Sequence, residues 1–277
     1  MESPPKTKVW VEGRYRKLVR DLPQTVFFCP DCKGHPRRRK KCERCGGFGK
    51  LTRESVQELV GWVLGKAFGT RRHKFHGAGR EDVDVRMLGE GRPFIMELVG
   101  PKAHDVDLAA AEAEINRRNE GRLEILGLHW TEKSRVRVIK EARRAKRYRA
   151  LVEIRGEPDL ERARALVGER VTIAQQTPAR VAHRRAEKVR ERWIELCSIE
   201  PVGDARFEVV VVTEHGTYVK EAISGEGGST TPSLGDLLGG VTCTCIELDV
   251  LDVLDEEGGA PEPAERGTGR RSFGAGI

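Results

Sequence analysis

The sequence predicts an α+β fold, with a mostly antiparallel, mixed central sheet and a small zinc module near the N-terminus. Two observations predict it. Segments with strand and helix periodicity follow one another without strict βαβ alternation, which favours antiparallel pairing. Two C-x-x-C units lie close together before the first long predicted helix. A chain of 277 residues has room for one large domain and such a module.

Changes in composition divide the chain into four predicted segments. Residues 1–28 form an N-terminal strand, at 9–19, and a linker that feeds the main sheet. Residues 29–49 form the zinc-binding module and residues 50–254 the main domain. Residues 255–277 are rich in Gly and poor in apolar side chains, which predicts a disordered tail.

The main domain is predicted to open with a helix. Ser55 and Glu58 match a capping box, in which the Ser side chain accepts a hydrogen bond from the Glu58 amide. Apolar residues recur at helical spacing from Val56 to Ala67, and Gly69 ends the run. We therefore expect this helix to face the core.

The following segments predict strands with some helices. Alternation over 83–88, the turn Gly89-Glu90-Gly91 and the apolar run 93–99 predict a hairpin at 79–99. A helix is expected at 107–119, ended by Gly121. The remaining expectations are strands at 123–130, 148–154, 193–200, 206–213, 217–223 and 243–253, and helices at 159–167 and around 183–191.

The chain is basic and highly charged. It carries 50 Lys and Arg against 43 Asp and Glu, a net charge of +7, and 34% of its residues are charged. This surplus favours a polyanionic partner such as RNA or DNA. No uncharged stretch reaches the ~18 residues that a membrane span needs, and residues 1–6 do not open a secretory signal. We expect no membrane contact and a cytoplasmic location.

Four of the seven cysteines have the spacing of a metal site. They follow the pattern C-x2-C-x9-C-x2-C, in which two tight turns supply four thiolates to one tetrahedral ion: Cys29, Cys32, Cys42 and Cys45. Four ligands complete a structural Zn²⁺ site and leave no open catalytic position. A redox dithiol would need only one C-x-x-C unit. The pattern also resembles DnaJ-type chaperone modules, which use more repeats.

A basic loop joins the two cysteine pairs. Residues 35–41 are rich in Lys and Arg and include Arg37, Arg38 and Arg39. Such a loop can contact phosphates of a nucleic acid. The alternative is a solvated run of charges with no partner.

Acidic residues gather where the predicted hairpin begins. Glu81, Asp82 and Asp84 follow Gly79 and Arg80. A carboxylate beside a basic side chain stays ionised and well oriented. By spacing alone, Asp82 and Asp84 share one face of a strand, and such pairs are more often surface groups than catalysts.

The same segment carries a family resemblance. Gly79-Arg80-Glu81-Asp82 matches the G-R-x-D core of pseudouridine synthases, and the longer run to Phe94 resembles the Pus10-type tRNA pseudouridine synthases of archaea and eukaryotes. Those enzymes act on T-loop uridines 54 and 55. Further matches follow in the family's order over about residues 10–254, at 16–25, 146–151, 176–185, 216–221 and 248–250. The resemblance implies the pseudouridine synthase fold, without the N-terminal accessory domain that family members usually carry.

Carried over residue by residue, the resemblance implies three catalytic residues. Asp82 matches the catalytic aspartate, Tyr148 the active-site tyrosine, and Lys220 the basic partner of that aspartate. An opposite charge keeps a carboxylate ionised, and a phenol offers a stacking face and a hydroxyl that can move a proton. Without the resemblance, Tyr148 is an ordinary packed strand tyrosine and Lys220 a solvated strand lysine.

The expected substrate-binding residues surround these three. Leu248 matches an apolar residue that lines the uracil pocket, and Tyr218 is expected to form a pocket wall on the same strand face as Lys220. Arg80 and Val219 lie in the matching motifs. In the zinc module, Arg37, Arg38 and Arg39 are the expected RNA contacts.

The resemblance implies a tRNA pseudouridine synthase. The expected reaction isomerises uridine to pseudouridine in the T-loop, at position 55 and as a further possibility at 54. The reaction needs no organic cofactor, so Zn²⁺ would be structural. The expected partner is tRNA through its T-arm, and a monomer is compatible with the sequence. The alternative is a tRNA-binding protein on the same scaffold that is inactive alone or needs a separate tRNA-binding subunit.

Overall fold

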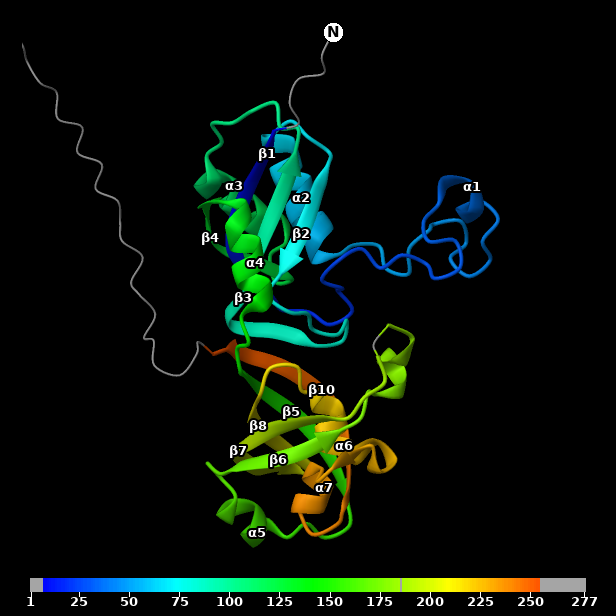
Figure 1. Cartoon of the computed structure of the whole chain (residues 1–277), viewed down its shortest axis with the longest axis vertical. Coiled ribbons are helices and arrows are strands. Elements are labelled where there is room, and N and C mark those ends of the chain that lie inside the picture. Colours follow the sequence, from blue (N-terminus) through cyan, green and yellow to red (C-terminus); the bar gives the residue numbers. More distant parts are fainter. Residues whose placement is uncertain (1–6, 185, 255–277) are drawn as a thin grey trace, which may run out of the picture.

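The described part of the chain forms one ten-stranded sheet, most of it antiparallel (Figure 1). The computed structural model describes residues 7–184 and 186–254, so the expected tail at 255–277 lies outside the described residues. Neighbouring strands follow the order β4-β1-β3-β10-β5-β8-β7-β6-β9, and β2 pairs with β3 outside this path. The strands are β1 (Lys8–Lys17), β2 (His73–Gly77), β3 (Arg86–Val99), β4 (Leu123–Thr131), β5 (Lys146–Arg155), β6 (Arg170–Gln175), β7 (Arg190–Gly203), β8 (Arg206–Thr213), β9 (Thr230–Thr231) and β10 (Thr242–Val253).

Short and medium helices complete the described chain. They are α1 (Pro36–Arg39), α2 (Val56–Ala67), α3 (Leu108–Arg118), α4 (Lys133–Glu141), α5 (Leu160–Ala165), α6 (Val219–Ser224) and α7 (Leu234–Leu237), with 3-10 turns η1 (Ala179–Arg184) and η2 (Gly225–Gly228). Among the described residues, no helix is long and apolar enough to cross a membrane. The predicted α+β class with a mostly antiparallel, mixed sheet is confirmed.

Two lobes share the sheet (Figure 1). The N-terminal lobe holds β1 to β4 with α2, α3 and α4, and the C-terminal lobe holds β5 to β10 with α5, α6 and α7. They meet where β3 runs parallel to β10 through the pairs Arg86–Asp249 and Met87–Val250. The other described strand pairs are antiparallel. The β3–β10 pair is therefore the seam between the lobes.

Most of the predicted elements are confirmed. The helix α2 has Ser55 as its N-cap, and the Ser55 side chain accepts a hydrogen bond from the Glu58 amide at 3.2 Å. The helix at 107–119 is α3, capped by Asp107. Five expected strands are present as β4, β5, β7, β8 and β10, and the expected helix at 159–167 is α5. Sequence patterns did not predict α4, α7, β2 or β6.

The predicted hairpin at 79–99 is wrong. Residues 86–99 form one continuous strand, β3, and the glycines do not reverse it. Gly89 and Gly91 have φ of 56° and 74°, and the β1–β3 register shifts beside them. A Cβ on Gly89 would overlap the Leu251 carbonyl oxygen of β10. The glycines form a bulge in β3. Before the bulge the strand pairs with β10, and beyond it the strand pairs with β1.

The predicted strand at 217–223 is also wrong, because Val219–Ser224 form the helix α6. Val219, Ala222 and Ile223 are buried, and this i, i+3, i+4 spacing places them on one helix face. The buried side chain of Gln175 bonds the Tyr218 amide at 2.7 Å and its carbonyl oxygen at 3.0 Å, which fixes the chain just before the helix.

The helix expected around 183–191 is not present over the described part of that range. η1 ends at Arg184, and β7 begins at Arg190. Thr177 holds the connection, since its hydroxyl donates to the Ala186 carbonyl at 2.8 Å and accepts from the Lys188 amide at 3.3 Å. These bonds keep the backbone extended and lead it into the long strand.

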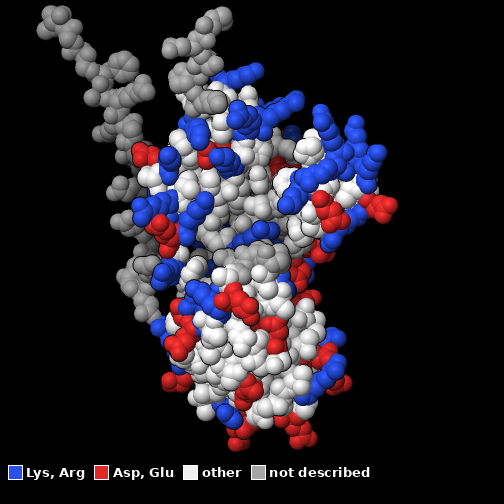
Figure 2. Space-filling model, turned by 45° about the vertical axis from the view of Figure 1, so that its right-hand side comes forward, with Lys and Arg blue, Asp and Glu red and all other residues white. Residues whose placement is uncertain are grey.

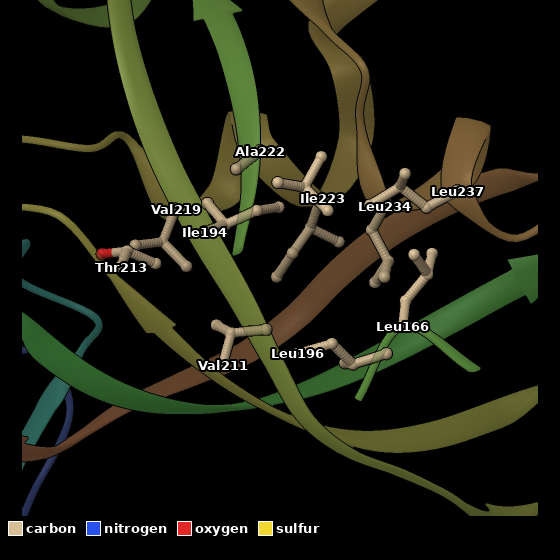
Figure 3. Close-up of a pocket in the computed structure, with 11 residues that line it drawn as sticks. Leu166, Ile194, Leu196, Val211, Thr213, Val219, Ala222, Ile223, Leu234 and Leu237 are labelled. Atoms are coloured by element: carbon tan, nitrogen blue, oxygen red, sulfur yellow. The ribbon is translucent and has the colours of Figure 1, made fainter. Parts of the chain in front are cut away.

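An apolar bed lies beneath α6 in the C-terminal lobe. Side chains from β7, β8, α6 and α7 point toward one another around a void of about 20 Å³ (Figure 3). Ile194, Val211 and Ile223 are among them, and each is at most 6% exposed. A void this small has room for about one water molecule. It is a packing gap that seats α6 on the sheet.

Gly89 provides a test of the seam. We expect Gly89→Ala to destabilise the protein more than Gly127→Ala, although both positions have positive φ, 56° and 64°. The left-handed backbone alone costs ~1 kcal/mol, and a Cβ on Gly127 would meet no atom within 4 Å. The overlap with Leu251 should add ~1–3 kcal/mol for Gly89→Ala. Urea unfolding of the two variants measures the difference, and equal losses would contradict the close approach.

Candidate active site and metal centre

A cleft of about 560 Å³ lies where the two lobes meet. The N-terminal lobe contributes the loop between β2 and β3, and the C-terminal lobe contributes β5, β10, α6 and the connection between β6 and β7. Every expected catalytic residue lines it, as do four expected substrate-binding residues: Asp82, Tyr148, Lys220, Arg80, Tyr218, Val219 and Leu248. The fold therefore gathers residues that are up to 168 positions apart, from Arg80 to Leu248, around one space.

Asp82 lies in a loop that buried side chains hold from below. Glu81 is buried, accepts from the Tyr15 hydroxyl at 2.8 Å and pairs with Arg92 at 2.8 Å. Lys17 is fully buried and donates to the Asp82 and Val83 carbonyl oxygens at 3.1 and 3.0 Å. Burial lowers the pKa of Lys17, against the raising effect of Glu81 and nearby acids. Glu81 and Lys17 together thus fix the backbone of the loop at Asp82.

The cation that binds the Asp82 carboxylate is Arg180. Its Nη1 lies 2.7 Å from Asp82 Oδ2, while its Nε and Nη2 bond the two carboxylate oxygens of Glu221 at 2.5 and 3.0 Å. Glu221 is 4% exposed. Burial alone would lower the pKa of Arg180, but Glu221 and Asp82 outweigh it and raise that pKa, so the guanidinium stays charged.

The expected pair of Lys220 with Asp82 is wrong. Lys220 Nζ bonds both carboxylate oxygens of Asp84, at 2.9 and 2.7 Å. Burial raises the pKa of Asp84, and Lys220 more than offsets this, so the pKa is lowered overall. Asp82 and Asp84 lie in a loop rather than on one strand face, because β3 begins only at Arg86. Two neighbouring acids therefore have two different cations.

Tyr148 and the apolar residues form one wall of the cleft. Tyr148 and Ala150 lie on β5. Their partners on the adjacent strand β10 are Val250 and Leu248, respectively. Burial raises the pKa of Tyr148 to about 12, and the charges of Glu81 and Asp82 contribute. The phenol is protonated at neutral pH. It can therefore donate a hydrogen bond beside a flat apolar surface.

A second part of the lining comes from the start of α6. The Tyr218 ring lies 5.9 Å from the Arg180 guanidinium carbon, and Gln175 fixes the Tyr218 backbone. The rim adds the basic side chains of Arg80, Lys146, Arg190 and Arg192. Burial, with Arg92 and Arg144 nearby, lowers the pKa of Lys146 to about 8. The cleft thus combines a carboxylate, a phenol, a hydrophobic wall and a cationic rim.

The four expected metal ligands form one cluster. Their sulfur atoms all lie within 4.8 Å of one another, with Cys29 3.7 Å from Cys42 and Cys32 3.7 Å from Cys45. Four thiolates around Zn²⁺ at ~2.3 Å are ~3.8 Å apart, so this donor set fits a tetrahedral ion. The Gly49 amide donates to Cys45 Sγ at 3.1 Å. The cluster can hold one metal ion.

The cysteine module projects to one side of the N-terminal lobe (Figure 1). Arg37, Arg38 and Arg39 form most of α1, and their side chains are exposed. Lys and Arg side chains gather on this module and on the N-terminal lobe, whereas much of the C-terminal lobe is uncharged in the same view (Figure 2).

The sequence comparisons agree with the site. The family model described as "Pus10, C-terminal" matches residues 10–254. The chain belongs to the Pus10 C-terminal family. The resemblance found in the motifs is thereby confirmed, and the matched range includes the cysteine cluster and the whole cleft.

Curated relatives of the Pus10 family cover most of this chain. A tRNA pseudouridine synthase Pus10 of Korarchaeum cryptofilum is 44% identical over 253 residues, which are 90% of this chain and 66% of that protein. One of Methanopyrus kandleri is 47% identical over 255 residues, 90% of this chain and 57% of that protein. The chain thus spans between half and two thirds of the length of these relatives. Among solved structures, a Cbf5-Nop10-Gar1 complex shares 19% identity at a TM-score of 0.40, over 72% of this chain and 45% of that chain.

Sequence reasoning missed three residues that organise the site: Gln175, Arg180 and Glu221. The motifs of the Pus10 resemblance contain Arg180 and Glu221, but the motifs say nothing about which charges meet. A strand at 217–223 would also have given Glu221 the wrong direction. Only the helix α6 turns Lys220 toward Asp84 and Glu221 toward Arg180.

The two ion pairs should differ in their effect on stability. Arg180→Ala leaves the buried Glu221 carboxylate without its cation, and we expect a loss of about 2 kcal/mol, discounted because the Arg180 side chain is 35% exposed. Lys220→Ala breaks a pair with an exposed carboxylate and should cost less than about 1 kcal/mol. Urea unfolding measures both. The double variant Arg180→Ala/Glu221→Gln should regain part of the loss, and its failure to do so would count against the pair.

Proposed function

We propose that this chain isomerises uridine to pseudouridine in tRNA, at position 55 of the T-loop and with position 54 as a second target. The observation that carries the proposal is the convergence of Asp82, Tyr148 and a cation in one cleft between the lobes. The relatives described as tRNA pseudouridine synthases support the same reaction.

The reaction conserves every atom of the nucleoside. The N1–C1′ bond breaks, the uracil turns within the cleft, and a C5–C1′ bond forms. C5 loses a proton and N1 gains one, so no oxidant, reductant or organic cofactor is required. The protein must supply a carboxylate near the sugar and base, a group that moves a proton, and a space that holds the free uracil.

The lining residues supply these three needs. Asp82, held by Arg180, is the carboxylate that acts at the sugar or base. Tyr148 is protonated at neutral pH, stacks on the base and relays a proton at C5 or C2′, passing on its own hydroxyl proton as it accepts one. Leu248 and Val250 keep the uracil in an apolar space, while Arg80 meets a neighbouring phosphate. Lys220 also lines the cleft, where it bonds Asp84 rather than Asp82, and it stays a catalytic candidate by direct contact with the substrate.

The cleft is suited to a single nucleotide that has left its loop. A base inside a stacked loop is out of reach, so enzymes that modify bases take the nucleotide out of the stack. Tyr218 and Val219 would contact the turned-out nucleotide opposite Tyr148. The expected source of this nucleotide is the T-arm of a tRNA.

We further propose that the cysteine cluster holds one structural Zn²⁺. Four thiolates at tetrahedral spacing leave no position for a substrate. The ion would hold residues 29–49 as a module on the catalytic domain, 50–254, while residues 1–28 feed β1 into its sheet. The module would then present Arg37, Arg38 and Arg39 to the RNA.

Asp82 is the sharpest test of the reaction. Asp82→Asn keeps the size of the side chain and removes its charge, so we expect RNA binding to survive and pseudouridine formation to be lost by at least ~10³-fold. Incubation with an unmodified tRNA transcript, followed by carbodiimide-stop primer extension, measures the product and its position.

Asp84→Asn is the matched control, because Asp84 is a neighbouring carboxylate with a different cation. It should keep most of the activity. An Asp82→Asn protein that still forms pseudouridine at an appreciable rate would overturn the assignment. Wild-type protein that binds the transcript but forms no product would favour the alternative, a tRNA-binding protein that needs a separate subunit.

Zinc content tests the metal centre. We expect about one Zn²⁺ per chain by atomic absorption, and Cys42→Ser should lose most of it because folding of so small a module is coupled to metal binding. Cys197→Ser is the control, since Cys197 lies outside the cluster. Unchanged zinc in Cys42→Ser would refute the site.

The basic side chains of the module provide a separate test. Replacement of Arg37, Arg38 and Arg39 by Ala should weaken tRNA binding and flatten its salt dependence.

A further inference from the structure

Polar side chains occupy much of one face of the sheet in the N-terminal lobe, although a helix covers it and Ile95 and Ile139 are buried there. Val11, Leu98 and Phe75 face the core on the side of α2 and α3. The alternate positions Trp10 and Glu97, which are direct partners across β1 and β3, face the other side. α4 packs against β2 and β3 there. A helix that covers a sheet normally buries apolar residues, so this polar layer is unusual.

A cleft of about 520 Å³ lies in this polar layer, between α4 and the strands β1, β2 and β3, and we call it the α4 cleft. Five Lys and Arg side chains line it against two carboxylates. Those carboxylates are already engaged, Glu97 by Lys8 at 2.7 Å and Glu141 by Arg137 at 2.9 Å. The cleft thus has more cations than its acids can balance.

Two of these cations are available to a ligand. Among the described residues, no carboxylate oxygen lies within 4.0 Å of the Lys133 or Lys140 nitrogen, and both side chains are exposed on α4. Trp10, which also lines the cleft, has a buried indole nitrogen with no hydrogen-bond partner. An unused N–H donor beside unpaired ammonium groups is the chemistry of an anion site.

A second hollow shares the helix α4 with the α4 cleft. That hollow, of about 360 Å³, lies on the other side of α4 and is lined by Arg14, Arg135 and Arg144. Its lining includes Ala78, which directly precedes the active-site loop. It also includes Arg144, which lies two residues before Lys146 of the active-site cleft. Basic side chains therefore line all three spaces, although in the second hollow Glu12 already pairs with Arg135 at 2.8 Å.

We propose that the α4 cleft binds the ribose-phosphate backbone of the substrate RNA, away from the nucleotide that reacts. This rests on the proposed function, because it assumes that an RNA occupies the active-site cleft. Lysines spread along an open cleft suit a string of phosphates rather than one small anion, which a fork of buried arginines would hold better. A polymer, unlike a small anion, can contact the α4 cleft and the active-site cleft at the same time.

The test uses the full chain and an unmodified tRNA transcript. Lys133→Ala/Lys140→Ala removes two cations from the cleft, and Arg162→Ala/Arg164→Ala removes two exposed cations from α5 at the far end of the other lobe as a matched control. Filter binding at ~50–200 mM KCl measures affinity and salt dependence. For the α4 variant we expect a Kd about tenfold higher and a log–log salt slope smaller by about 1–2, with the control unchanged.

Two further variants separate charge and hydrogen bonding from folding. Lys133→Arg/Lys140→Arg should restore binding, and Trp10→Phe, which keeps a ring but removes the N–H, should raise the Kd about two- to fivefold. Wild-type affinity and slope in Lys133→Ala/Lys140→Ala would overturn the proposal. A second result would also overturn it. If inorganic phosphate protects Lys133 and Lys140 from acylation as strongly as the transcript does, the cleft binds a small anion rather than an RNA backbone.

The same variants separate this proposal from the reaction itself. At saturating transcript, Lys133→Ala/Lys140→Ala should form pseudouridine at the wild-type rate, since the variant changes only affinity. Asp82→Asn should do the reverse, with normal affinity and no product. Suppose that the wild-type protein forms no product, while Lys133→Ala/Lys140→Ala shows the smaller salt slope. The RNA-binding surface is then supported and the proposed reaction is wrong. Product formation with an unchanged slope sinks the surface alone.

Discussion

The active site depends on one buried ion pair, that of Glu81 with Arg92. Both side chains are about 1% exposed, and taking two charges out of water is costly unless every polar atom finds a partner. Tyr15 donates to Glu81, and Arg92 also donates to the Ala78 carbonyl oxygen at 2.9 Å. Removing either partner of such a pair costs ~3–5 kcal/mol. The loop on which Asp82 sits is therefore tied to β1 and β3 immediately before the residue that needs a fixed position.

The seam between the lobes explains why the cleft lies where it does. Asp249 on β10 is 3% exposed and accepts from Arg86, Arg20 and Arg149, at 2.6 to 3.2 Å. These arginines lower its pKa against the effect of burial, so the carboxylate remains charged at neutral pH. Arg20 comes from the segment after β1 and Arg149 from β5, so one carboxylate joins both lobes. The cleft is the space that remains above this joint.

Local signals predicted most elements, and the failures occur where a distant contact decides. Ser55 and Asp107 cap their helices by bonds within four residues, so sequence alone could find α2 and α3. The close approach of Leu251, 162 positions later, leaves no room for a Cβ at Gly89, and no local pattern distinguishes a bulge from a turn. The same limit applies to the site. Motifs named Asp82 and Lys220, but only the folded chain assigns Arg180 to the first and Asp84 to the second.

The consecutive residues of α6 make contacts in different directions, which a helix allows and a strand does not. Successive side chains on a helix point ~100° apart, whereas on a strand alternate side chains share a face. As a strand, residues 218 and 220 would point into the cleft together and residue 221 away from it. As a helix, Val219 borders both the apolar bed and the cleft, Lys220 reaches Asp84, and Glu221 reaches Arg180. Three neighbours thus anchor the helix, hold the acidic loop and fix the cation of Asp82, which ties the shape of the cleft to the packing beneath it.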